Sequence, residues 1–204
     1  VNHGLGITPR MVIVKNRTDA NRWQVYHEDL SADGSYTKKN ILLNDTAAES
    51  GYSSQIKSVS SSAFVVRDVD SDGNANVNKN NSNYVAYCFA EVEGYSKIGS
   101  YISNNTSDGT FIYLGFRPAW VMFKAADQAN AWSIQDTVRQ TVNPSNALLS
   151  PNENSAEYTT GVKIDFVSNG IKHRNDSGYY NNVANKVFIY MAFAEAPFKY
   201  SNAR

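Results

Sequence analysis

The residues most suggestive of chemistry form an acidic loop. Its oxygen-bearing side chains stand mostly at alternate positions, with a glycine after the third aspartate: Asp68, Asp70, Asp72, Gly73, Asn74 and Asn76. This spacing imitates a calcium-binding loop, but position twelve is Lys79 where such loops carry a bidentate Glu, and no helical pattern flanks it. A solvated Asn-rich surface loop is the favoured interpretation, so we predict no metal or cofactor site and leave calcium binding at this loop open.

Two pairs of glutamates recur along the chain, Glu49 with Glu157 and Glu91 with Glu195. A glycosidase needs two carboxylates about 5–10 Å apart across a cleft, and such pairs are candidates for that role. A residue that recurs in both halves is more simply a structural anchor. The sequence also lacks a nucleophile elbow, a phosphate-binding loop and a dinucleotide motif. We therefore predict that the protein is not an enzyme and has no catalytic residues.

Aromatic side chains are candidate platforms for sugar rings. Trp23 and Trp132 each lie in an alternating segment with an apolar partner, Val25 and Ile134, so packing in the core is favoured over sugar stacking. Better candidates for surface contact are tyrosines in polar stretches: Tyr101, Tyr179 and Tyr180.

Histidine and cysteine offer little further chemistry. His3, His27 and His173 are too scattered to suggest a metal cluster, and His27 at a strand end is expected at the surface. The single cysteine, Cys88, excludes an internal disulfide and a Cys-based zinc cluster. It lies in an apolar run, which predicts a buried, inert thiol.

The composition excludes several classes of partner. The 204 residues carry 19 basic and 19 acidic side chains, which argues against a nucleic-acid groove or a polybasic membrane surface. No apolar run approaches the ~20 residues that span a bilayer, so we predict no membrane insertion. The 24 asparagines suit neutral, sugar-like partners, although asparagine also fills turns in β proteins. Because the chain starts at Val1 and opens almost directly on a strand, we expect it to be a segment of a longer polypeptide.

The segments that would position these residues occur twice in the sequence. Leu5–Lys15 reads LGITPRMVIVK and Leu114–Lys124 reads LGFRPAWVMFK. A tryptophan follows each lysine by eight residues, and the proline, lysine and tryptophan landmarks are all 109 residues apart. Three landmarks at one offset indicate an internal duplication.

The hydrophobic pattern predicts an all-β fold without a sustained helical repeat. We expect two sequence-related, antiparallel, jelly-roll-like β-sandwich units: residues 1–95, and residues 96–204 with a connecting strand. Expected strands include Met11–Val14, Arg22–Tyr26, Asn40–Asn44, Ala63–Arg67, Tyr84–Glu91, Lys97–Ile102, Ala119–Lys124, Ala131–Gln135, Val162–Val167, Ile171–Arg174 and Lys186–Glu195. Asn169-Gly170 predicts a tight hairpin turn. The polar run Asp68–Asn83 and a Ser-rich segment before Ala63 are expected to be loops.

These motifs resemble a known family. The opening G-[FI]-x-P-x-x-V-x-x-K pattern, the N-x-W of Asn21–Trp23 and Asn130–Trp132, and the closing YVAYCFAEVEGYSK of Tyr84–Lys97 are similar to a domain of unknown function in tail proteins of marine and other bacteriophages. The resemblance covers Gly4–Lys199, while the loop Asp68–Asn83 is longer and more polar than usual. No functional residues are established for that family.

The resemblance implies a structural or adhesion module of a virion appendage, such as a tail fibre or a receptor-binding tail protein, located in the extracellular particle. Expected partners are other virion proteins, a host-surface glycan or protein, and further copies of the chain, with a trimer as one plausible state. Two alternatives stay open at this point: a capsid decoration or head-fibre protein, and a polysaccharide-degrading tail spike.

Overall fold

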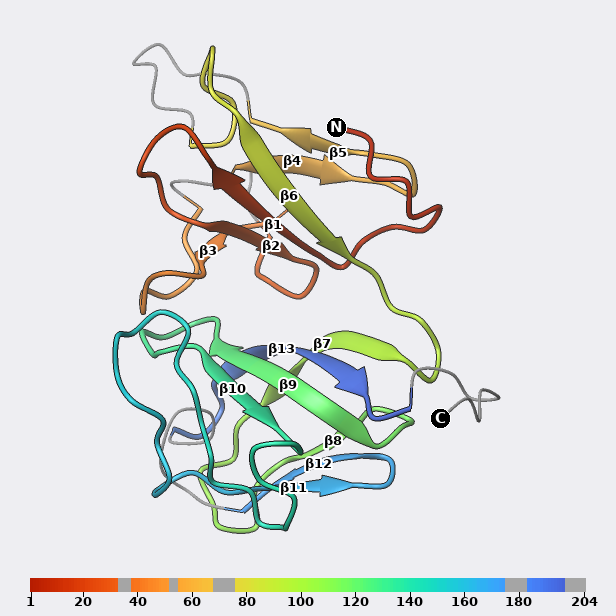
Figure 1. The fold of residues 1–204 in the computed structure, drawn as a ribbon, viewed down its shortest axis with the longest axis vertical. Coiled ribbons are helices and arrows are strands. Elements are labelled where there is room, and N and C mark those ends of the chain that lie inside the picture. The colour runs from red at the N-terminus through yellow and green to blue at the C-terminus, as the bar shows by residue number, and fades with distance from the viewer. Residues whose placement is uncertain (33–37, 52–54, 68–75, 175–182, 197–204) are drawn as a thin grey trace. The chain divides into compact units, whose positions relative to one another are not determined.

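A computed structural model describes residues 1–32, 38–51, 55–67, 76–174 and 183–196 (Figure 1). These residues form strands and connections without helices, and every pairing between the named strands is antiparallel. The prediction of an all-β protein is therefore confirmed. The described part of the chain contains no helix long and apolar enough to cross a membrane.

The chain divides into two compact units, of which the first is Val1–Ala90. Its strands are β1 (Met11–Asn16), β2 (Gln24–His27), β3 (Ile41–Leu42), β4 (Ile56–Val59), β5 (Phe64–Val66) and β6 (Tyr84–Phe89). Four of them form a sheet in the order β3-β2-β1-β6, and β4 pairs with β5. β1 takes a central place because its apolar run Met11–Val14 is buried on both faces.

The core of this first unit lies between the four-stranded sheet and the β4–β5 hairpin. Its members come from both layers and from the loop before β6: Val12, Val14, Tyr26, Ile56, Phe64 and Val77. Four further side chains pack against this core and are only partly buried: Val59, Val66, Tyr84 and Cys88.

The second unit, Glu91–Arg204, also has two antiparallel sheets, with one more strand among its described residues. Its strands are β7 (Ser96–Ile102), β8 (Phe111–Tyr113), β9 (Pro118–Ala125), β10 (Ser133–Asp136), β11 (Ile164–Val167), β12 (Gly170–His173) and β13 (Val187–Ala194). One sheet has the order β10-β9-β13-β7 and the other β11-β12-β8. Apolar side chains of both sheets, among them Phe123, Phe166 and Phe188, form a larger core between them.

The two units pair their strands in the same register. Met11 of β1 lies opposite His27, and 109 residues later Trp120 of β9 lies opposite Asp136. On its other side β1 pairs with β6 and β9 pairs with β13 in equivalent registers. In the second unit β13 also pairs with β7, whereas no described strand pairs with the other edge of β6.

Two expectations about local structure are corrected. The Ser-rich segment expected to be a loop contains β4, where Ile56 reaches the core although its strand neighbours are polar or half-buried. The β11–β12 turn consists of residues 168–169, so Gly170 is already the first residue of β12, opposite Val167. Glycine is needed there for a close approach between strands and not for the turn itself, because a Cβ on Gly170 would lie 2.1 Å from the carbonyl oxygen of Ile112 in β8.

Candidate functional site

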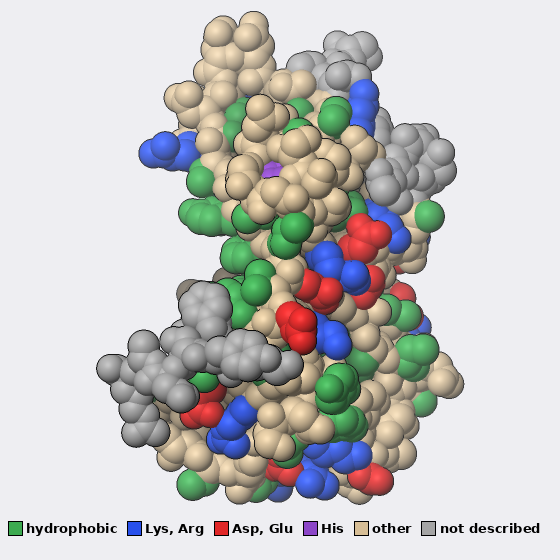
Figure 2. Space-filling model, turned by 90° about the vertical axis from the view of Figure 1, so that its right-hand side faces the viewer, with side chains coloured by type: hydrophobic (Ala, Val, Ile, Leu, Met, Phe, Trp, Pro, Cys, Tyr) green, Lys and Arg blue, Asp and Glu red, His purple; other side chains and the backbone are tan. Residues whose placement is uncertain are grey.

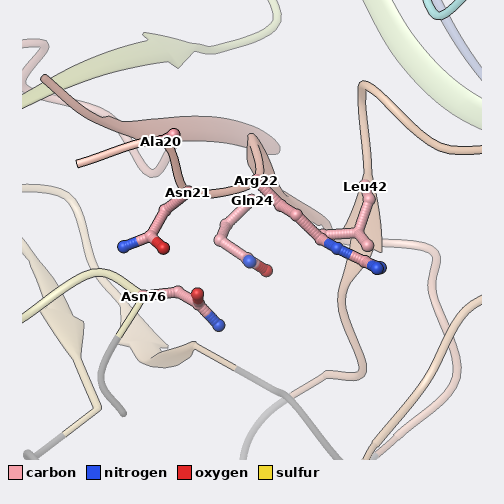
Figure 3. Close-up of a pocket in the computed structure, with 6 residues that line it drawn as sticks. All are labelled: Ala20, Asn21, Arg22, Gln24, Leu42 and Asn76. Carbon is pink, nitrogen blue, oxygen red and sulfur yellow. The ribbon is translucent and has the colours of Figure 1, made fainter. Parts of the chain in front are cut away.

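The candidate site is a hollow of about 370 Å³ in the first unit. The connection between β1 and β2 contributes Ala20, Asn21 and Arg22, β2 contributes Gln24, β3 contributes Leu42, and the loop before β6 contributes Asn76. Figure 3 shows the carboxamides of Asn21, Gln24 and Asn76 gathered around one space, with the Arg22 side chain running beside Leu42.

Gln24 is the buried polar residue of this hollow, with 2% of its surface exposed. Asn40, also buried, donates from Nδ2 to Gln24 Oε1 at 2.6 Å. The side-chain nitrogen of Gln24, Nε2, has no hydrogen-bond partner among the described residues. One end of the carboxamide is therefore fixed by the protein, and the other is left for a ligand or water in the hollow.

The two asparagines of the hollow are similarly unengaged. The side chains of Asn21 and Asn76 donate and accept no hydrogen bonds within the described structure. Arg22 lies at the rim with its guanidinium Nη1 2.9 Å from Asp45 Oδ2, so its charge is balanced. The described lining of the hollow thus presents carboxamide donors and acceptors with little net charge.

Asp19 ties together the two segments that carry these asparagines. Within the β1–β2 connection, Asn16 Oδ1 accepts hydrogen bonds from the backbone N–H groups of Thr18 at 2.8 Å and Asp19 at 2.9 Å, which fixes the turn. The Asp19 carboxylate then accepts from Lys79 Nζ at 3.0 Å and from Ser82 Oγ at 3.1 Å. The hydrogen bond from Lys79 is the main cause that lowers the pKa of Asp19. These contacts hold the loop of Asn76 against the turn of Asn21.

A second hollow, of about 410 Å³, lies in the other unit and is less suited to a ligand. Its lining includes Glu91, Glu93, Lys97 and Tyr113. These groups are already engaged: Glu91 Oε1 accepts from the backbone N–H of Ile98 at 3.0 Å, and Lys97 Nζ lies 5.3 Å from the centre of the Tyr113 ring. The carboxamide hollow is therefore the better candidate.

Most of the acidic loop that the sequence suggested as a calcium site is not described by the structure. Residues 68–74 lie outside the described residues, while Asn76 is described and lines the carboxamide hollow. Across the described ranges there is no group of three or more His, Cys, Asp or Glu side chains placed to hold a metal ion.

The aromatic candidates that the structure describes are all buried or half-buried. Trp132 is 1% exposed and belongs to the core, as the favoured interpretation predicted. Trp23 is half-buried, and both tryptophans precede their strands instead of lying in them. The expectation that Tyr101 is an exposed contact residue is wrong: its ring stacks on Phe188 at 5.3 Å and is 8% exposed. Tyr179 and Tyr180 lie outside the described residues.

Glu49 and Glu157 act as anchors within their own units. Glu49 accepts hydrogen bonds from the backbone N–H of Ser31 at 2.8 Å and from the hydroxyl of the same residue, and Lys39 Nζ lies 3.6 Å from it. Glu157 accepts from Arg139 Nη1 at 2.5 Å. Both glutamates therefore hold the segment that follows β2 or β10.

The matched glutamates lead to a first prediction. Glu49→Ala should lower the free energy of unfolding by about 2 kcal/mol, because the Glu49 side chain is only 7% exposed and its carboxylate accepts from both the N–H and the hydroxyl of Ser31. Glu157→Ala should cost less than about 1 kcal/mol, because that side chain is 37% exposed and Arg139 keeps Asp136. Denaturant unfolding of both variants measures the difference, and equal losses would contradict these roles.

Glu91 and Glu195 are engaged as well, since Glu195 Oε2 lies 2.9 Å from Arg117 Nε and Glu91 binds the backbone as described above. The expectation of a surface imidazole at His27 is wrong: the side chain is fully buried, and its Nδ1 accepts from the backbone N–H of Asp29 at 3.1 Å. Cys88 is only half-buried, and burial still raises the pKa of its thiol.

Sequence reasoning missed the carboxamide hollow. Gln24 stands at a polar position of an alternating segment, a pattern typical of a solvent-facing side chain, and its partner Asn40 is 16 residues away. The one available signal was the density of asparagines in the β1–β2 turn and around Asn76. On the face in Figure 2, acidic and basic side chains are interspersed and much of the surface is uncharged.

Comparisons with known proteins give one match. A family model described as "Domain of unknown function (DUF7483)" matches residues 1–197. No curated protein matches the chain, and no solved structure does.

Proposed function

This chain belongs to the family described as Domain of unknown function (DUF7483), and from this starting point we propose that it is a non-enzymatic structural and adhesion module of a bacteriophage virion appendage, such as a tail fibre. The assignment to a phage particle rests on the sequence resemblance to tail proteins. The adhesive role rests on the carboxamide hollow of the first unit. The expected partners are a host-surface glycan, neighbouring virion proteins and further copies of the chain.

The scaffold for this role is a duplicated β-sandwich. The equal registers of β1 with β2 and β9 with β10 support a common origin of the two units. Equivalent contacts outside the strands also support a common origin. The backbone N–H of Trp23 donates to Asn44 Oδ1 at 2.9 Å, and the backbone N–H of Trp132 donates to Asn152 Oδ1 at 2.8 Å. A jelly-roll-like connection of each unit stays a prediction.

The observation that carries the adhesive role is the set of unengaged carboxamides. Each carboxamide offers both a donor and an acceptor, and a pair of vicinal sugar hydroxyls needs both. The hydrogen bond from Asn40 already fixes the Gln24 side chain, so little conformational entropy is lost when Gln24 binds a ligand. The described lining of the hollow carries no unbalanced charge, which favours a neutral glycan over an anionic or cationic ligand.

Alanine substitutions of the two free asparagines provide the test. Asn21→Ala and Asn76→Ala should each weaken glycan binding by about 3- to 10-fold, because each removes one or two hydrogen bonds worth about 1 kcal/mol each. Neither side chain bonds to the described protein, so both variants should keep the parent stability. Asn169→Ala, an exposed asparagine in the other unit, is the matched control and should bind like the parent.

The assay is a glycan array followed by adsorption of the labelled chain to host cells. Binding that is reduced by the Asn21 and Asn76 substitutions and spared by the control supports the proposal. A blank array together with absent adsorption would exclude receptor binding. Release of reducing ends from a host polysaccharide would favour a spike enzyme instead, and cryo-EM of the particle would separate a tail location from a capsid decoration.

A further inference from the structure

The second unit has a strand without a counterpart among the described residues of the first unit. β7 pairs with β13 along seven residue pairs, from Val187 opposite Ile102 to Phe193 opposite Ser96. β13 corresponds to β6 of the first unit, since Phe193 and Phe89 occupy equivalent places opposite Trp120 and Met11. The outer edge of β6 therefore corresponds to the edge of β13 that β7 covers.

The backbone groups at this edge of β6 can be identified by alternation. At the end of β13, the N–H of Ala194 donates to the carbonyl oxygen of Tyr95, on the β7 side. Alternate residues of a strand point their N–H and C=O groups to the same side, so Tyr190 and Ala192 also face β7. Their equivalents in β6, 104 residues earlier, are Ala86 and Cys88. Outside the pairing of β6 with β1, no described residue hydrogen bonds to the backbone of either.

The core beside this edge is also incompletely covered. In the second unit β7 inserts Tyr101 against Phe188, and Phe188, Tyr190 and Ala192 are all buried in the core. In the first unit the equivalents of these three residues, Tyr84, Ala86 and Cys88, are half-buried or exposed. Both the hydrogen-bonding groups and the apolar side chains at the edge thus remain available.

We propose that the outer edge of β6 is a docking site for one antiparallel strand of a neighbouring polypeptide, in the register that β7 takes on β13. Such a strand completes the hydrogen-bond ladder, the mode of binding known as β-augmentation. A second β6 is a poorer partner. The symmetric antiparallel pair centred on the middle of the three outward-facing residues places Ala86 opposite Ala86 and leaves the smallest side chains over the uncovered part of the core.

The structure also fixes the kind of side chain that this partner strand carries. β7 needs Gly99 opposite Tyr190, because a Cβ at Gly99 would lie 2.8 Å from Tyr190 Oη. The equivalent of Tyr190 in β6 is Ala86, which leaves that space free. The docking strand therefore differs from β7 at this position, with a large apolar residue opposite Ala86, and keeps an apolar or aromatic residue opposite Tyr84.

The experiment supplies such a strand to the full chain. A second copy of Ser96–Gly109 is added in front of Val1, which reproduces the spacing between β7 and the following repeat. Three versions differ only at the residue of the added copy that corresponds to Gly99. The first keeps the glycine, the second carries Gly99→Leu in the added copy, and the third carries Gly99→Pro there. Proline lacks the N–H that the ladder needs and is the matched control.

Amide hydrogen exchange at Ala86 and Cys88 is the readout. In the leucine version we expect exchange at least 10-fold slower than in the parent chain, with a smaller effect for glycine and none for proline. Exchange at Tyr190 should not change. Unchanged exchange at Ala86 and Cys88 in the leucine version overturns the proposal. Slower exchange that appears in the parent only at high protein concentration also overturns it, since that would identify pairing of β6 with a second β6.

Discussion

Gly170→Ala should be the most damaging small substitution in the second unit, with a loss of about 4 kcal/mol in the free energy of unfolding or a failure of that unit to fold. The added Cβ would lie 2.1 Å from the Ile112 carbonyl oxygen and 3.1 Å from Phe111 Cε2. Both contacts belong to β8, so relief requires β8 and β12 to separate. Overpacking alone costs about 1–3 kcal/mol, and displaced Ile112 also leaves the core.

The measurement is guanidinium unfolding followed by hydrogen exchange at Ile171, which reports on the second unit. Ser168→Ala, two residues earlier in the exposed turn, is the control and should stay within about 0.5 kcal/mol of the parent. A Gly170→Ala chain within 1 kcal/mol of the parent by the same assay would contradict the close approach of β8 and β12.

Acid should destabilise the second unit through His173. The imidazole is fully buried, with its ring centre 5.0 Å from that of Tyr101 and 5.4 Å from that of Phe123. Burial lowers the pKa of His173 from 6.5 to about 3, with a smaller contribution from the charge of Lys172. In the unfolded chain the same imidazole takes up a proton below about pH 6.5.

The sign follows from this difference in proton binding. Between about pH 6.5 and 3 the unfolded chain holds a proton that the folded chain excludes, so stability falls as the pH falls. The slope should approach about 1.4 kcal/mol per pH unit in the middle of this window, with a total of about 4–5 kcal/mol. Above pH 6.5 the group adds no pH dependence.

His173→Phe isolates this contribution, because phenylalanine fills a similar space among the aromatic rings and does not titrate. Carboxylates with lowered pKa, such as Asp108 and Asp136, also destabilise the folded chain in acid but remain in the variant. The difference between the two stability curves should therefore grow from pH 6.5 downward. Parallel curves across this range would show that His173 does not stay neutral in the folded state.

The strands with continuous apolar character could be predicted from the sequence. The runs that became β1, β9 and β13 are apolar on both faces and stood out in the pattern. β4 was missed because only Ile56 of its four residues is buried and serines surround it. Its strand conformation is set by pairing with β5, which is a tertiary effect that a local pattern does not contain.

Burial of polar and aromatic residues depended on partners far away in the sequence. Tyr101 stands between Ser100 and Ile102, both exposed, and reads as a surface position. It is buried because β7 pairs with β13, which begins 85 residues after Ile102 and brings Phe188 beside the Tyr101 ring. Gln24 became part of the candidate site for the same reason, through Asn40. Neither partnership is visible before the sheet order is known.

The most direct test of adhesion through the carboxamide hollow is the nuclear magnetic resonance of its side-chain amides during titration with the strongest neutral glycan from the array. The Gln24 Nε2 protons should shift with the same saturation curve as those of Asn21 and Asn76, and the shifts of Gln24 should vanish in a chain that carries both alanine substitutions. Binding of the glycan without any change at these three amides would contradict the proposed site.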